Sequence, residues 1–199
     1  RPLAQGDSVV IGWKFDGRFL PGVTKNGGNT DEFILPSGVV LTGFSPSFMP
    51  VLGFMELVGE TEKNTTEPRR YRRDYHKGVT RGGYGATAWF PARIVVTGPE
   101  AYTLNSVGVC TSNTVSDGWR TQAWETDHPV KILNIVCGKW SVKQGEQSTV
   151  YYHAGHDYNL EEMSAALDAS RRWFSEWFTP YPWRELKLSE FPGLAGYAQ

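Results

Sequence analysis

The sequence predicts a mainly β protein, in which an antiparallel β-sandwich is followed by one long amphipathic helix and a strand. Aromatic residues make up 14% of the 199 residues and there are 22 Gly and 12 Pro, a composition typical of short strands joined by turns. Up to about residue 152 strand-like runs follow one another without a helical period between them. A chain of this length can form one sizeable core, or one domain and the start of a second.

The strand-like runs begin with two that are typical of hairpins. Residues 8–15 (SVVIGWKF) precede a Gly- and Asn-rich loop at 24–31, and residues 33–40 contain a turn signal at Pro36, Ser37 and Gly38. Five later runs are separated by Gly-Pro, Ser-Asp-Gly and Gln-Gly-Glu turns, at 89–96, 102–110, 118–125, 131–140 and 149–153. This spacing predicts an antiparallel sandwich.

Residues 59–85 interrupt the strand pattern and predict a polar loop. Its basic side chains are Arg69, Arg70, Arg72, Arg73, Lys77 and Arg81. Tyrosines lie between them, so the run could start a nucleic-acid site, but acids dilute it and the net charge of the chain is -1. We therefore favour a solvated loop or a docking surface for another domain, and expect no nucleic-acid partner.

A helix is predicted at about 160–178. Asn159 with Glu162 predicts a capping box, and Pro180 with Pro182 ends the helix. Leu160, Met163, Leu167, Ser170, Phe174 and Trp177 recur at steps of three and four and form one strongly apolar face, which Trp173 and Phe178 widen. The charges expected to lie on the solvent side are Asp168, Arg171, Arg172 and Glu176. A strand at about 184–191 (RELKLSEF) covers part of the apolar face, and we expect Trp173, Phe174 and Trp177 to be partly exposed.

The two cysteines, Cys110 and Cys137, lie in apolar strand-like runs and predict two buried free thiols, with a disulfide as the alternative. The chain has no stretch of about 18 apolar residues and no signal-like start, so we expect it to be soluble by itself.

The histidines do not predict a metal site. His153, His156 and Asp157 lie close together in the sequence HAGHD, but before a helix rather than on one helical face. We interpret them as turn residues, with incidental zinc or nickel binding as the alternative. His76 lies in the basic loop and His128 precedes Pro129. The sequence also lacks HExxH, GxSxG, GxxxxGK[ST] and a GxGxxG after a strand, so no catalytic residue is assigned.

An ordered series of motifs resembles one known family. The series is DGW at 117–119 with Thr121, ETDHPV at 125–130 and NIVCGKW at 134–140. It resembles a segment of the aminopeptidase N (membrane alanyl aminopeptidase) family of zinc metallopeptidases. Residues 167–183 (LDASRRWFSEWFTPYPW) resemble the first helix of that family's catalytic domain, and 185–192 the strand that leads to its GAMEN motif.

The resemblance implies a division into an N-terminal β domain at 1–152, saddle-like and forming one wall of the substrate cleft, and a truncated start of the catalytic domain at 153–199. Gly196, Tyr197, Ala198 and Gln199 fall at the substrate-binding GAMEN-like position, where Gln199 offers a neutral amide in place of the family's Glu. It implies zinc in the parent protein, bound by residues beyond Gln199, and none in this chain. Among members of this family, the sequence most resembles bacterial ones that are joined to an ABC-transporter-like permease. This resemblance implies a membrane-associated parent.

We therefore expect a non-catalytic fragment of such a metallopeptidase, whose parent hydrolyses peptides at their N-termini. Its partners are the remainder of the catalytic domain and, in the parent, a peptide; the exposed helix face could also form an oligomer contact. The alternative is a β-sandwich binding platform of a membrane transport or assembly protein. A third hypothesis is a carbohydrate- or nucleic-acid-binding sandwich that uses exposed Trp residues and the basic loop.

Overall fold

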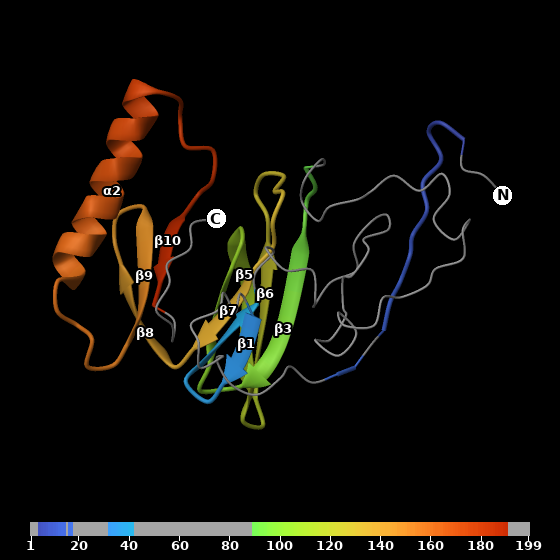
Figure 1. The fold of residues 1–199 in the computed structure, drawn as a ribbon, viewed down its shortest axis with the longest axis horizontal. Helices are drawn as coiled ribbons and strands as arrows, with labels where there is room; N and C mark the ends of the chain where they lie inside the picture. Colours follow the sequence, from blue (N-terminus) through green and yellow to red (C-terminus); the bar gives the residue numbers. More distant parts are fainter. Residues whose placement is uncertain (1–3, 15, 18–31, 42–88, 191–199) are drawn as a thin grey trace, which may run out of the picture.

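A computed structural model describes residues 4–14, 16–17, 32–41 and 89–190. In this part of the chain ten strands form three sheets, accompanied by one helix (Figure 1). The strands are β1 (Glu32–Leu35), β2 (Gly38–Leu41), β3 (Arg93–Pro99), β4 (Thr103–Ser106), β5 (Val109–Ser116), β6 (Trp119–Glu125), β7 (Ile135–Gly138), β8 (Trp140–Gln144), β9 (Ser148–His153) and β10 (Leu186–Ser189). The helix is α2 (Leu160–Trp177).

Two antiparallel sheets form the sandwich that the sequence predicts. One has the order β1-β2-β7-β4 and the other the order β3-β6-β5. Leu104 and Cys137 from the first sheet and Trp124 from the second form a buried cluster. Partly buried side chains surround it from both sheets: Val39, Ile94, Val96, Tyr102 and Ile135. Burial of this apolar surface between the sheets is what holds them together.

The third sheet has the order β10-β9-β8 and combines two kinds of pairing. β8 and β9 form an antiparallel hairpin, whereas β10 lies parallel to β9. The chain leaves β9, passes through α2 and returns as β10, and a helical crossover of this kind places the returning strand parallel to the first. The predicted order of sandwich, helix and strand is confirmed, and α2 lies alongside this sheet at one end of the molecule (Figure 1).

The start of α2 differs from the predicted capping box. Asn159 is the N-cap residue, but it has φ 61° and ψ 17° and its side chain makes no capping hydrogen bond. A capping side chain reaches the first turn from a β-region backbone, and the left-handed backbone of Asn159 directs it elsewhere. The capping box was therefore wrong, although the helix begins where the sequence predicts. The backbone carbonyl of Asn159 still accepts a hydrogen bond from the N–H of Met163 at 2.9 Å.

Two charges of α2 that were interpreted as solvent-side groups instead dock the helix. Asp168 accepts the N–H groups of Glu146 and Gln147, at 2.9 and 3.0 Å, in the turn between β8 and β9. Arg171 donates to three carbonyls, those of Gln147 at 2.9 Å, Arg184 at 2.6 Å and Trp183 at 3.1 Å. Desolvation alone would raise the pKa of Asp168, but these hydrogen bonds and the charge of Arg171 lower it.

Several strand predictions need correction. Residues 8–14 form no strand in the described part, and Val10 is 98% exposed; a β-prone run gains stability only from strands that pair with it. The run at 102–110 divides into β4 and β5 at Gly108, whose φ is 79° and where a Cβ would overlap the Glu125 backbone. In the run at 89–96 the strand begins only at Arg93, and in the run at 131–140 it begins only at Ile135.

The hairpin of β1 and β2 with its turn at Pro36 and Ser37 is confirmed. Predictions for residues 15, 24–31 and 59–85 lie outside the described residues.

Both cysteines are free thiols, as predicted, but only one is buried. Cys137 lies in the sandwich core, where desolvation raises its pKa to about 12. Cys110 is exposed at the irregularity of β5, so its predicted burial was wrong. The shift in register between Cys110 and Ser112 breaks the alternation of inward and outward side chains that the sequence pattern assumes.

Replacing Trp124 by Ala should lower the free energy of unfolding by about 3–5 kcal/mol, because its side chain is only 2% exposed in the core. Urea unfolding followed by circular dichroism measures this difference. Trp119→Ala is the matched control, since it lies on the same strand with 54% exposure and should change stability by about 0.5 kcal/mol or less. Equal losses for the two variants would contradict the placement of β6 in the sandwich.

Candidate functional site

A cluster of two histidines and one carboxylate lies where β9 and β10 end. His153 is the last residue of β9, and Glu190 directly follows β10. Since the strands are parallel, with Ser189 opposite Tyr151, their carboxyl ends reach the same edge of the sheet. His156 joins them from the turn before α2, where the His156 N–H donates to the His153 carbonyl at 3.0 Å.

Glu190 is the centre of this cluster. Its Oε2 accepts the backbone N–H of His153 at 2.8 Å and lies 3.2 Å from His153 Nδ1, while its Oε1 contacts His156 Nδ1. On the far side of the ring, His153 Nε2 lies 3.2 Å from the carbonyl oxygen of Ser37 in the turn between β1 and β2. Four segments of the chain therefore meet at this point.

The cluster is open to solvent but not fully exposed. The side chains of His153, His156 and Glu190 are 23%, 60% and 33% exposed. Desolvation would raise the pKa of Glu190, but the hydrogen bond from the backbone N–H of His153 and the two neighbouring imidazoles lower it. Their potential ligand atoms all lie within 4.8 Å of one another. Among the described residues, His153, His156 and Glu190 are the His, Cys, Asp and Glu side chains that lie close enough together to hold a metal ion.

The sequence identified two members of the cluster but not the third. His153 and His156 lie in and beside a turn, as interpreted, yet their shared partner is Glu190 and not Asp157. Glu190 appears in the sequence only as an acid at the end of a predicted strand. Its position beside the histidines depends on the parallel register of β10 with β9, which no local pattern encodes.

Lys187 forms a second polar feature, in a cavity of about 310 Å³ between β10 and the sandwich. Its ammonium group donates to the carbonyl oxygens of Ser106, at 2.6 Å, and Gly108, and lies 4.3 Å from the centre of the Trp124 ring. Desolvation lowers the pKa of Lys187 to about 8. Because carbonyls and the aromatic face already surround the nitrogen, we interpret this side chain as a link between sheets.

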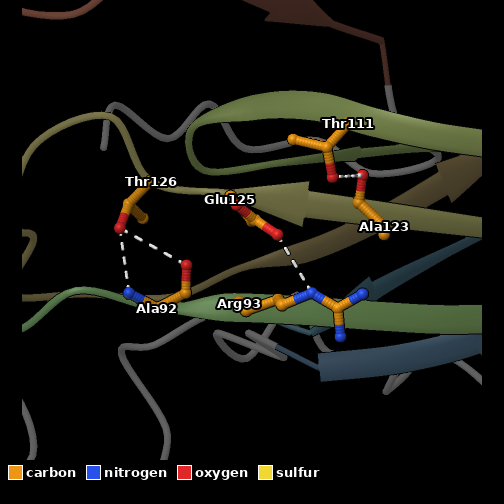
Figure 2. A network of polar contacts seen from close by, with 6 residues as sticks. All are labelled: Ala92, Arg93, Thr111, Ala123, Glu125 and Thr126. Carbon is orange, nitrogen blue, oxygen red and sulfur yellow. Dashed lines mark hydrogen bonds and ion pairs between the residues drawn. The ribbon is translucent and has the colours of Figure 1, made fainter.

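The motif residues that carry the family resemblance have structural roles in this fold. DGW at 117–119 makes the tight turn between β5 and β6, with positive φ at Asp117 and Gly118. Figure 2 shows Thr126, whose hydroxyl accepts the Ala92 N–H at 2.9 Å, and Glu125, which pairs with Arg93 at 3.0 Å. Asp127 accepts the Arg184 N–H at 2.7 Å, joining the sandwich to the segment before β10.

The zinc-binding motif of the family that the sequence resembles is absent from this sequence. That motif is HExxH, whose histidines are four residues apart on a helix, whereas the histidines of HAGH at 153–156 are three apart, at a strand end and in a turn, with no Glu between them. Gly196, Tyr197, Ala198 and Gln199 lie outside the described residues. In the described part no helix combines the length and hydropathy that crossing a bilayer requires.

No protein-family model and no curated protein matches the sequence. Similar solved structures include an M1 zinc metallopeptidase from Deinococcus radiodurans, with 22% identity over 52% of this chain and 26% of that chain and a TM-score of 0.39. A two-domain M1 zinc metallopeptidase mutant bound to L-arginine matches at 22% identity over 52% of this chain and 26% of its own, with a TM-score of 0.38. This chain thus spans about a quarter of the length of these proteins.

The amine of Lys187 should titrate near pH 8, well below its ordinary value of 10.5. We expect the Cε carbon resonance, assigned through its loss in Lys187→Arg, to shift with that midpoint in an NMR titration of the whole chain. Since the pKa is lower in the folded state, the contribution of Lys187 to the unfolding free energy should rise between about pH 8 and 10.5 and be constant outside that range. A midpoint at the ordinary value would show that the amine is hydrated and not enclosed.

Proposed function

We propose that this chain is part of an aminopeptidase N-like zinc metallopeptidase, with residues 1–152 as its N-terminal β domain and 153–199 as the start of its catalytic domain. The ordered sequence motifs at 117–140 and 167–199 support the proposal. The structural observation that carries it is a broad aromatic surface at the C-terminal end of α2 and on the residue that follows it, which the described residues leave uncovered.

The aromatic surface is formed by Trp173, Phe174, Trp177 and Phe178. Their exposed fractions are 42%, 57%, 63% and 78%, which confirms the prediction that the first three would be partly exposed. Trp173 stacks on Trp177 with ring centres 5.5 Å apart, and the ring of Phe174 lies 6.5 Å from that of Trp177 and 6.0 Å from that of Phe178, so the four side chains form one continuous patch. An exposed patch of large aromatic side chains is typical of a surface that another part of a protein covers.

Two further features support the remainder of a catalytic domain as the cover. An apolar groove of about 450 Å³ adjoins the patch and is lined in part by Phe174, Pro180, Pro182, Trp183 and Leu186. Within the described residues, β10 is also an edge strand, so its open side can accept another strand. A helix with an uncovered face beside a sheet with an open edge is the arrangement expected of an incomplete α/β unit.

In this proposal the chain supplies structure and substrate contacts, whereas the parent supplies the chemistry. The β-sandwich forms one wall of the cleft, and Gly196, Tyr197, Ala198 and Gln199 contact the N-terminal end of a peptide. A zinc ion bound beyond Gln199 would activate water in the parent. The finer assignment, to a bacterial parent joined to a permease, is supported only by the resemblance of the sequence.

One observation favours a different function, a non-catalytic binding platform in a membrane transport or assembly protein. Gln199 replaces the carboxylate with which the family binds the substrate's α-amino group, and a neutral amide makes a weaker contact with an ammonium group. The parent would then keep the peptidase-like fold and bind a partner without hydrolysing it.

The test uses the longer protein encoded by the gene from which this chain derives. We expect its sequence to contain HExxH and a more distal Glu, and the protein to release amino acids from N-terminally free peptides. A chelator should abolish that activity and zinc should restore it. Gln199→Glu should raise kcat/KM for these peptides by at least about 10-fold, because a charge-assisted contact replaces a neutral one.

A gene product without HExxH, or one with the motif but no zinc-dependent hydrolysis, would contradict the peptidase assignment and favour the platform. A second comparison tests the aromatic surface. Trp177→Ala should leave the Tm of the present chain nearly unchanged but lower that of the longer protein, and Trp119→Ala should affect neither. Equal effects of Trp177→Ala in both proteins would show that this surface is not covered by the rest of the parent.

A further inference from the structure

We propose that His153, His156 and Glu190 form a binding site for a divalent transition-metal ion of the zinc class. The site would be separate from the zinc of the family that the sequence resembles, since that zinc would be bound beyond Gln199. The proposal therefore does not depend on the function of the parent protein. It rests on how the hydrogen-bond partners of His153 fix its tautomer.

The carbonyl of Ser37 offers an acceptor to His153 Nε2 and so supports the tautomer in which this nitrogen carries the hydrogen. A carbonyl oxygen can only accept, so the contact of 3.2 Å is a hydrogen bond only when His153 Nε2 is the donor. A neutral imidazole has one N–H, and Nδ1 then presents a lone pair. Metal-binding histidines commonly have this arrangement, with the second nitrogen donating to a carbonyl and the first facing the metal.

The lone pair of His153 Nδ1 faces a carboxylate. Glu190 Oε2 lies 3.2 Å away and is also an acceptor, so two lone pairs oppose each other unless a cation lies between them. That cation is either a proton, which makes His153 an imidazolium, or a metal ion. His156 Nδ1 faces the other oxygen of the same carboxylate, so both imidazoles converge on Glu190.

The three side chains match the ligands of a zinc-class ion. Two imidazole nitrogens and one carboxylate suit zinc, nickel, cobalt or iron, whereas calcium and magnesium prefer oxygen ligands alone. The ligand atoms lie within 4.8 Å of one another, so small side-chain rotations would bring them to the distances of about 2.0–2.2 Å that zinc requires. The partial exposure of the cluster leaves room for water as a fourth ligand.

The backbone already holds the ligands in place. Gly155, with φ 90°, allows the turn that returns His156 toward His153. The His153 N–H holds Glu190 Oε2 at 2.8 Å, and the parallel register of β10 fixes the position of Glu190 along the sheet. A bound ion would be coordinated by residues at the ends of β9 and β10 and in the turn that leads into α2. It would link these three segments and should therefore stabilise the C-terminal part of the chain.

The test is metal binding by the whole 199-residue chain after treatment with a chelator. We expect one equivalent of Co²⁺ to give the visible absorption bands of a nitrogen- and oxygen-ligated ion, one equivalent of Zn²⁺ to displace it, and Zn²⁺ to raise Tm by several degrees. Glu190→Gln and His156→Ala should each weaken binding at least about 10-fold. Circular dichroism of these variants without metal shows whether they remain folded.

Two substitutions serve as matched controls. Asp157→Asn removes a carboxylate adjacent in sequence but outside the cluster, and His128→Ala removes an exposed histidine elsewhere; both should bind Zn²⁺ as the original chain does. Absence of stoichiometric binding would overturn the proposal, as would equal binding by Glu190→Gln and the original chain. A proton resonance on His153 Nδ1 that persists in excess Zn²⁺ would show that the proton occupies this position instead. None of these outcomes affects the peptidase assay of the longer protein.

Discussion

The parallel pairing of β10 with β9 is the constraint on which the candidate site and the docking of α2 depend. β10 contributes only four residues to the sheet, yet two of its side chains contact the sandwich. Lys187 and Ser189, two residues apart, lie on one face and contact the sandwich, through the carbonyls of Ser106 and Gly108 and through the side chain of Asn105. Glu190, at the end of the strand, contacts both histidines.

The contacts of α2 place β10 in this register. Arg171 holds the segment before β10 through the carbonyls of Trp183 and Arg184, and Asp168 holds the turn between β8 and β9. Gly145 in that turn allows the close approach, since a Cβ there would lie 2.5 Å from Ser164 Oγ. The helix thus joins the hairpin to the strand that follows it, while its aromatic surface remains available to another partner.

Local features of the fold could be predicted from the sequence because they depend on residues close together in the chain. The hairpin at Pro36 and Ser37, the helix from Leu160 and the strand after Pro182 all follow from turn chemistry and periodicity. The run at 8–14 forms no strand in the described part, because a β-prone run needs pairing strands that a local pattern does not contain. The left-handed backbone of Asn159 differed from prediction because the residue types that predict a capping box do not fix the backbone angles of the N-cap.

The candidate metal site could be predicted only in part, for the same reason. The sequence brings His153 and His156 together, but Glu190 is separated from His153 by α2 and reaches it only through the crossover. The roles of Asp168 and Arg171 could not be predicted for the same reason. They bind backbone groups that are distant in the sequence, and a helical pattern does not indicate these partners. Long-range register therefore decides both the site and the docking of the helix.

Hydrogen exchange of the Glu190 amide tests the pairing of β10 most directly. This N–H donates to the Tyr151 carbonyl at 2.8 Å, so the account predicts that it exchanges slowly, at a rate comparable with the amides of β6, whereas the exposed amide of Val10 exchanges rapidly. Rapid exchange of the Glu190 amide while the amides of β6 remain protected would show that β10 is not paired with β9, and would contradict the account.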